Sequence, residues 1–215
     1  MVQTPHQDMP PVVYVVDDDD ALRDSLTWLI RSADYEVASY AAADACVCAF
    51  RDDRPACLLL DVRMPGMSGL ELQEALRLRA ASVPIIFITG HGDVPMAVRA
   101  LKAGAFDFVE KPFDDGVVLA RIQAAIDLHR ERLAERAHRE SLLDRWRILT
   151  PRERQTLRKV AQGLQNKMIA HDLDISQKTV EVHRHNGLEK MACHSAADLA
   201  RMLMTLGDAA QDDAP

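Results

Sequence analysis

The stretch Cys57-Leu58-Leu59-Leu60-Asp61 is an uncharged apolar run that ends on an acid. A short continuous apolar run is typical of a strand buried on both faces of a parallel sheet. Thr89 and Lys111 also close apolar, strand-like runs further along the chain. Because parallel strands bring their carboxyl ends to one edge of the sheet, the sequence predicts that these three polar side chains lie close together.

Strand and helix patterns alternate through the first 130 residues. Runs of β-branched and aromatic residues predict strands at 12–16, 36–40, 57–60, 84–88 and 106–109. Helical spacing of apolar residues predicts helices over 20–32, 41–51, 69–79 and 94–103. Asp114 is expected to cap a longer fifth helix. This alternation predicts an α/β doubly wound, five-stranded parallel sheet with the flavodoxin-like strand order.

Strand patterns disappear after residue 149. Thr150, Pro151 and Glu153 form the signature of a capping box with proline in the first turn. Ser176 and Ser195 are expected to cap two further helices. Two short helices, a tight turn and a longer helix predict an all-α helix-turn-helix domain.

Composition sets limits on the class of protein. The chain has 215 residues, of which 48% are hydrophobic, and this is enough for two cores. It contains no run of 18 uncharged apolar residues and no secretory signal pattern at its start, so we expect a cytoplasmic protein without a membrane partner. Residues 1–130 carry 20 acidic and 12 basic side chains, whereas 131–215 carry 13 and 14. This asymmetry indicates two modules with different partners.

Acids near Asp61 predict a metal site at the edge of the sheet. Asp17 and Asp18 follow the first strand, and carboxylate oxygens are the ligands that Mg²⁺ (or Mn²⁺) prefers. Asp18 and Asp61 can each supply an oxygen, Asp17 can hold a metal-bound water, and Arg63 can offer its backbone carbonyl. A helix N-cap is the simpler interpretation of the acids at 17–20 taken alone. The joint pattern instead favours a phosphoryl-transfer pocket.

In such a pocket Asp61 would act as the nucleophile on a phosphoryl donor. Lys111 and the Thr89 hydroxyl would contact the phosphoryl oxygens, on which negative charge builds up during transfer.

Four motifs in residues 12–126 resemble the receiver domain of two-component response regulators. They are Val15-Val16-Asp17-Asp18-Asp19, Leu60-Asp61-Val62-Arg63-Met64-Pro65-Gly66-Met67-Ser68-Gly69, Ile88-Thr89-Gly90 and Gly104-Ala105-Phe106-Asp107-Phe108-Val109-Glu110-Lys111-Pro112-Phe113. The resemblance implies that a sensor histidine kinase phosphorylates Asp61. It also implies that Thr89 and Phe108 switch together, and that the Lys111–Pro112 bond is cis.

Residues 150–206 resemble the LuxR/NarL-type output domain, and the whole chain therefore resembles a FixJ-type regulator. Three motifs carry this second resemblance: Leu149-Thr150-Pro151-Arg152-Glu153-Arg154, Gly163-Leu164-Gln165-Asn166-Lys167-Met168-Ile169-Ala170 and Ile175-Ser176-Gln177-Lys178-Thr179-Val180-Glu181-Val182-His183-Arg184. We expect contacts with double-stranded DNA from Lys167, Gln177, Lys178, Thr179, Glu181, Arg184, His185 and Lys190. Val180 and Val182 are expected to be inward or half-buried.

These patterns predict a phosphorylation-dependent transcriptional regulator rather than an enzyme with a diffusible substrate. Phosphorylation would drive formation of a homodimer through the receiver, with Arg99, Lys102 and Asp107 at the interface. We expect a receiver domain at 1–127, a helical linker at 128–148, a helix-turn-helix domain at 149–207 and a frayed tail at 208–215. The linker would be either a solvated spacer or a coiled seam between two chains.

Gly187 departs from the pattern, since related output domains usually carry an apolar residue in the middle of this helix. Its position predicts that Gly187→Val or Gly187→Ile raises the melting temperature of the isolated output domain. It also raises an alternative function, a receiver that acts mainly through protein partners with weak or atypical DNA binding.

Overall fold

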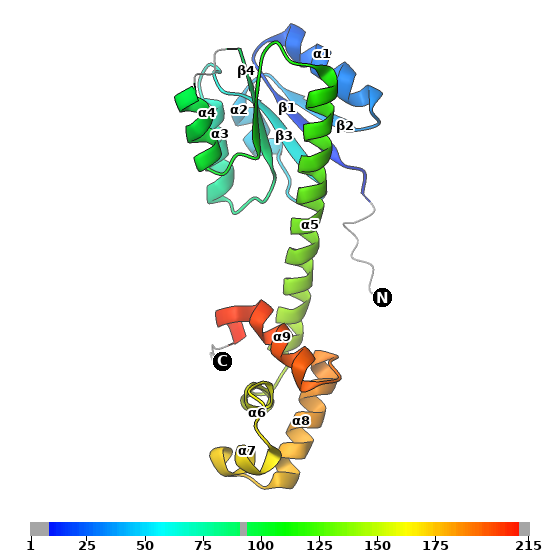
Figure 1. Cartoon of the computed structure of the whole chain (residues 1–215), viewed down its shortest axis with the longest axis vertical. Coiled ribbons are helices and arrows are strands. Elements are labelled where there is room, and N and C mark those ends of the chain that lie inside the picture. The colour runs from blue at the N-terminus through cyan, green and yellow to red at the C-terminus, as the bar shows by residue number, and fades with distance from the viewer. Residues whose placement is uncertain (1–8, 91–93, 211–215) are drawn as a thin grey trace. The chain divides into compact units, whose positions relative to one another are not determined.

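The computed structural model describes residues 9–90 and 94–210 (Figure 1). The chain divides into two compact units, Met1–Glu135 and Arg136–Pro215. Among the described residues, no helix combines the length and the apolar character that a membrane span needs.

Unit 1 is built on a five-stranded parallel sheet with the order β2-β1-β3-β4-β5. The strands are β1 Val12–Val16, β2 Glu36–Tyr40, β3 Ala56–Asp61, β4 Ile85–Thr89 and β5 Asp107–Glu110. The helices are α1 Asp20–Ser32, α2 Ala43–Ala49, α3 Gly69–Leu78, α4 Val94–Lys102 and α5 Asp115–Arg147, the last of which continues into unit 2. This is the predicted doubly wound fold with the flavodoxin-like strand order.

Helices cover both faces of the sheet, as Figure 1 shows. Alternate residues of β1 point to opposite faces: Tyr14 packs with residues of α2, α3 and α4, whereas Val13 and Val15 pack with α1 and α5. The three central strands β1, β3 and β4 are buried along their whole length. Continuous apolar runs appear in the sequence because each central strand meets helices on both sides.

The strand ends differ slightly from the prediction, and the difference bears on the site. β3, β4 and β5 each extend one residue beyond the predicted end, so that Asp61 and Thr89 are the last residues of their strands. The helix predicted over 41–51 is confined to Ala43–Ala49. It ends there because the backbone of Phe50 becomes extended, and the ring of Phe50 packs against Tyr14.

Unit 2 contains the last turns of α5 and a compact set of short helices. They are α6 Pro151–Ala161, α7 Asn166–Leu173, α8 Gln177–Met191, α9 Ala196–Leu206 and the 3₁₀ turn η1 Gly207–Ala210. Thr150 and Glu153 form the predicted capping box, and the Ser176 and Ser195 side chains cap α8 and α9 as expected. The turn between α7 and α8 closes on Asp174, which has the left-handed backbone conformation common after helices.

The predicted frayed tail begins later than expected. Residues Gly207–Ala210 form η1, Ala210 is buried, and its carbonyl accepts a hydrogen bond of 2.7 Å from the Arg158 Nε. Residues 211–215, the rest of the predicted tail, lie outside the described residues. The C-terminal turn therefore belongs to the core of unit 2, because α6 holds it through Arg158.

The apolar residues of the predicted linker are used inside the two units. Leu133 is buried in unit 1, and Leu142 and Trp146 lie in the core of unit 2. Between them, residues 138–141 are exposed and polar. Among the described residues, α5 therefore offers no apolar stripe for a coiled seam, and its middle is a solvated helix.

The surroundings of Gly187 contradict the premise that a larger side chain would fill free space in unit 2. A Cβ atom at this position would lie 2.9 Å from Cδ1 and 3.0 Å from Cγ of Leu157, which is fully buried in α6. The glycine is not a packing defect. The Leu157 side chain of α6 occupies the space that a side chain at position 187 of α8 would need.

Candidate functional site

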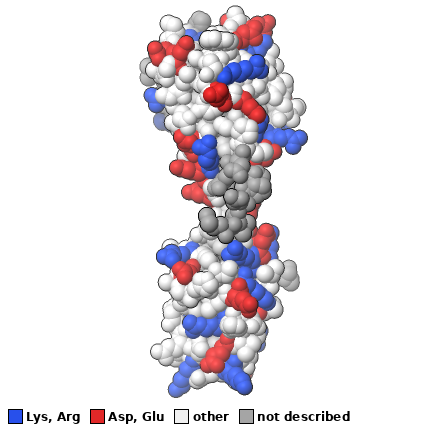
Figure 2. Space-filling view, turned by 90° about the vertical axis from the view of Figure 1, so that its right-hand side faces the viewer, with Lys and Arg blue, Asp and Glu red and all other residues white. Residues whose placement is uncertain are grey.

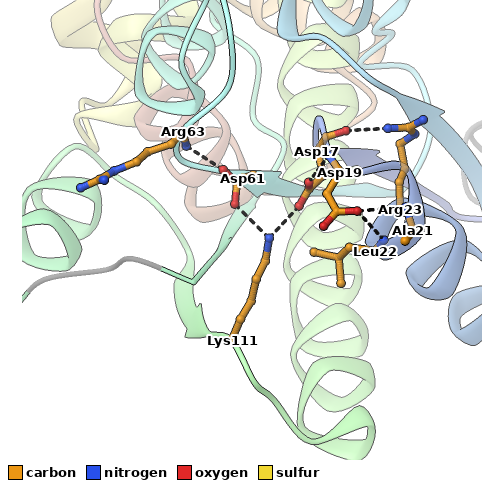
Figure 3. A network of polar contacts seen from close by, with 8 residues as sticks. All are labelled: Asp17, Asp19, Ala21, Leu22, Arg23, Asp61, Arg63 and Lys111. Atoms are coloured by element: carbon orange, nitrogen blue, oxygen red, sulfur yellow. Dashed lines mark hydrogen bonds and ion pairs between the residues drawn. The ribbon is translucent and has the colours of Figure 1, made fainter.

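A lysine joins two carboxylates at the carboxyl edge of the sheet (Figure 3). The Lys111 Nζ lies 2.9 Å from the Asp17 Oδ2 and 3.1 Å from the Asp61 Oδ1. Asp17 follows β1, Asp61 ends β3, and Lys111 follows β5. Three segments far apart in the sequence thus place one cation between two buried acids, as the parallel topology requires.

Backbone N–H groups fix the orientation of both carboxylates. The Asp61 Oδ2 accepts a hydrogen bond of 2.7 Å from the Arg63 N–H, and the Asp17 Oδ1 accepts one of 2.9 Å from the Asp19 N–H. Burial raises the pKa of Asp61 because it disfavours the charged form, and the Lys111 ammonium and the Arg63 N–H oppose this shift. Burial alone would lower the pKa of Lys111, but the two carboxylates together raise it.

Gly69 lets the loop after β3 fold back onto the site. A Cβ atom there would lie 2.2 Å from the Asp61 carbonyl oxygen, so only glycine allows the approach. The Gly69 N–H donates to the Val62 carbonyl over 3.1 Å, and Ser68 caps α3 in a capping box with Glu71. The loop between β3 and α3 therefore runs close to Asp61, as its glycines and proline predict.

The donor set suits a hard divalent cation. Asp17 and Asp61 bring two buried negative charges against one lysine, and the exposed Asp18 adds a third. Oxygen ligands with excess negative charge are what Mg²⁺ requires. The three side chains are not gathered in advance, since no cluster of acids, histidines or cysteines within residues 9–90 and 94–210 is tight enough to hold a metal.

Thr89 and Phe108 lie on the neighbouring strands. Thr89 is buried at the end of β4, and its carbonyl accepts a hydrogen bond of 2.9 Å from the Lys111 N–H. Phe108 in β5 is half-buried and packs against the core that α2, α3 and α4 cover. The Lys111–Pro112 peptide bond is cis, as the resemblance implies.

Unit 2 exposes one face of α8. Gln177, Lys178, Glu181 and His185 are exposed, while Val180 is fully buried against the core. Residues four and seven or eight apart share one side of a helix, so these polar groups form a continuous surface. A helix of this kind, held by a second helix across a tight turn, has the form that enters a major groove.

Comparisons with known proteins identify a domain family for each part of the chain. Residues 13–123 match the model of the response regulator receiver domain, and residues 147–203 match that of the luxR family of bacterial regulatory proteins. The transcriptional regulatory protein FixJ of Azorhizobium caulinodans is 45% identical over 94% of this chain and 96% of its own. The chain belongs to the FixJ-type response regulators.

Two further relatives extend this result. The response regulator protein TodT of Pseudomonas putida is 42% identical over 94% of this chain and 88% of its own. The solved structure of the response regulator StyR is 44% identical, covers 91% of this chain and 99% of its own, and has a TM-score of 0.83. FixJ-type regulators are phosphorylation-dependent transcription regulators with a receiver and a LuxR-type DNA-binding domain.

Three of the residues expected at DNA in this FixJ-type regulator have partners inside the unit. The Lys190 Nζ lies 2.9 and 2.8 Å from the two Glu153 carboxylate oxygens. The Arg184 Nη1 donates to the Asn166 Oδ1 over 3.0 Å, and the hydroxyls of Thr179 and Ser176 are 2.8 Å apart. The ion pair of Lys190 with Glu153 links α8 to the start of α6.

Two apolar residues, Val182 and Met168, are more exposed than the sequence pattern predicts. Val182 was expected to be inward or half-buried, but it is 50% exposed beside Lys178 and Glu181 on α8. Met168 on α7 is 54% exposed, next to the exposed Lys167. An apolar side chain on a recognition helix can contact a thymine methyl group. The exposure of Val182 and Met168 indicates such a contact, whereas their residue type alone suggests a place in the core.

Figure 2 shows lysines and arginines interspersed with acids over the surface. Some of these basic residues lie at the end of unit 2 that α7 and α8 form. Lys167 and Lys178 are exposed on these two helices. A DNA-binding surface of this modest charge depends on base contacts as well as on phosphate contacts.

Proposed function

We propose that a sensor histidine kinase transfers a phosphoryl group to Asp61 and that this modification controls DNA binding by unit 2. The observation that carries the proposal is the Lys111 ammonium placed between the carboxylates of Asp17 and Asp61. A carboxylate oxygen of Asp61 would attack phosphorus, the bond from phosphorus to the kinase histidine nitrogen would break, and an acyl phosphate would form.

The residues around Asp61 have separate roles in this transfer. Lys111 and the Thr89 hydroxyl would contact the phosphoryl oxygens and balance their charge. Asp17, Asp18, Asp61 and the backbone carbonyl of Arg63 would hold Mg²⁺ or Mn²⁺. The metal, when bound, neutralises charge on the acids and the phosphoryl group.

Thr89 and Phe108 would then carry the signal to the surface made by α4, β5 and α5. Thr89 moves toward the phosphoryl group, and Phe108, which is only half-buried, has room to repack. Arg99 and Lys102 are exposed on α4, and Asp107 forms an ion pair of 2.9 Å with Arg121 of α5. A second copy of the chain pairing through this surface would bring two output domains together on a symmetric DNA site.

Contacts with DNA would come from α7 and α8. Base edges would be met by Gln177, Lys178, Glu181 and His185, and phosphates by Lys167, Thr179 and Arg184. Val182 joins this set, and Lys190 supports it through Glu153. The alternative of weak DNA binding depended on Gly187, which packs closely against Leu157 and leaves α8 a regular helix.

The boundary between the two units, after Glu135, falls inside the proposed helical linker. We place the receiver at 1–127, the helical linker at 128–148 and the DNA-binding domain from 149 through the ordered turn that ends at Ala210. The protein acts in the cytoplasm, where the kinase and the DNA meet.

Incubation with a small phosphoryl donor and Mg²⁺, followed by intact mass measurement, tests this function. The wild type should gain one phosphoryl group, Asp61→Asn should gain none, and Thr89→Ala should be phosphorylated without a gain in DNA affinity. Asp18→Asn should raise the Mg²⁺ concentration needed. Equal phosphorylation of wild type and Asp61→Asn would show that the phosphoacceptor is elsewhere.

A further inference from the structure

His129 on α5 is fully buried and makes two hydrogen bonds at the amino end of the sheet, away from the phosphorylation site. Its Nδ1 lies 2.9 Å from the Ala56 N, the first residue of β3, and its Nε2 lies 2.9 Å from the Asp52 Oδ1. Neither contact takes part in the proposed phosphoryl transfer.

The partners determine the protonation of the ring. A backbone N–H can only donate, so the Nδ1 that faces Ala56 is an acceptor and carries no proton. The proton is then on Nε2, which donates to the carboxylate of Asp52. The His129 imidazole therefore accepts a hydrogen bond from the backbone of β3 on one side and donates one to a carboxylate on the other.

Asp52 extends the network to a second strand. Its Oδ2 accepts hydrogen bonds from the N–H and the hydroxyl of Ser82, at 3.2 and 3.4 Å. The Arg132 Nη1, one turn further along α5, donates to the Ser82 carbonyl over 2.7 Å. The segments that precede β3 and β4 are thus both tied to α5, and these are the strands whose other ends carry Asp61 and Thr89.

The hydrogen bonds of His129 can fix the position of α5 along the strands, which apolar packing alone does not. Ile122, Ala125 and Ile126 of α5 pack on the sheet, but apolar contact is non-directional and does not specify where the helix sits along a strand. The hydrogen bond from Ala56 to His129 does specify it. Ala56 is itself fully buried, so without the imidazole its N–H would be an unsatisfied donor.

We propose that His129 is a positioning residue that fixes the register of α5 on β3 and β4 and is required for phosphorylation to change DNA binding. α5 runs without a break to Arg147, and its Leu142 and Trp146 belong to the core of unit 2. α5 therefore contributes residues to both units, and a change in its register on β3 and β4 would act on residues of the same helix that belong to the output core. The inference rests on the proposed function.

The test is a coupling ratio measured on the full-length protein. The dissociation constant for a duplex selected in vitro with the wild type is measured without and with beryllofluoride and Mg²⁺, and the first value is divided by the second. The variants are His129→Phe, which removes both hydrogen bonds, and His129→Gln, whose amide can accept from Ala56 and donate to Asp52. His138→Phe on the exposed part of α5 is the matched control.

We expect a wild-type ratio within the usual allosteric range of about 5 to 150. His129→Phe should bring the ratio toward one, His129→Gln should restore at least half of the wild-type value, and His138→Phe should leave it unchanged. Beryllofluoride binding itself should survive in every variant, because Asp61 is at the opposite end of β3. A loss of stability alone would lower both affinities and keep the ratio.

A wild-type ratio in His129→Phe would overturn the proposal. If His129→Phe does not fold, His129→Leu, which also removes the acceptor for the Ala56 N–H but has a smaller side chain, replaces it, and an unchanged ratio there is equally contrary. A ratio of one in the wild type would instead reject the proposed function, so the two failures are distinguishable.

Discussion

Replacing Gly187 by valine tests how closely α8 packs on α6. The new Cβ would lie 2.9 Å from the Leu157 Cδ1, and two methyl groups would extend beyond it into a fully buried region. Overpacking a core costs about 1–3 kcal/mol, and this site lies at the upper end because Cγ and Cδ2 of Leu157 are also within 3.2 Å. Valine gains only about 0.5 kcal/mol of helix propensity over glycine.

The net effect is a loss of about 2 kcal/mol, which corresponds to a melting temperature about 10 °C lower for a domain of this size. The assay is thermal unfolding of the full-length chain followed by fluorescence of Trp146, which is buried in unit 2. The other tryptophan, Trp28, is 73% exposed in unit 1 and is replaced by phenylalanine in all samples.

A double-mutant cycle locates the effect. Leu157→Ala alone costs about 2–5 kcal/mol because it leaves a cavity. In the double variant the valine occupies part of that cavity, so the combined loss should be at least about 1 kcal/mol smaller than the sum of the single losses. An unchanged or raised melting temperature in Gly187→Val, or strict additivity in the cycle, would refute the close approach of the two helices.

Three other predictions concern charge and recognition. Lys111→Met should destabilise unit 1 by about 3 kcal/mol at pH 7.5, because two buried carboxylates lose their cation, and millimolar Mg²⁺ should recover much of the loss in chemical denaturation; no recovery would argue against the metal site. Burial opposes ionisation of Glu153, but Lys190 and the Thr150 N–H lower its pKa, so stability from this group is present above about pH 4.5 and lost as pH falls further. Glu153→Gln should remove this part of the loss of stability at acid pH, as measured by unfolding followed with Trp146 fluorescence. An equal dependence of stability on pH in wild type and Glu153→Gln would contradict the prediction. Val182→Ala should weaken specific DNA binding about fivefold at one base position while leaving non-specific, salt-dependent binding unchanged, and a uniform loss over all sequences would count against a thymine contact.

In the output domain, local sequence patterns predict the ends of helices but not the contacts between them. The capping box at Thr150 and Glu153, the caps at Ser176 and Ser195 and the tight turn at Asp174 involve residues only a few positions apart, and each was predictable. The exposure of Val182, the role of Gly187 and the ion pair between Lys190 and Glu153 were not. Each depends on the distance between helices that are remote in sequence, which spacing along one helix does not define.

For the receiver, the sequence by itself determined the order of strands and helices and the three positions Asp61, Thr89 and Lys111. It did so because buried parallel strands need continuous apolar runs, and because polar residues that end such runs must meet at one edge. Tertiary structure alone decided that Lys111 bridges Asp17 and Asp61, and that His129 ties Ala56 to Asp52. These are directional contacts over 50 to 94 residues of separation, and hydrogen-bond geometry within them is set by packing rather than by residue type.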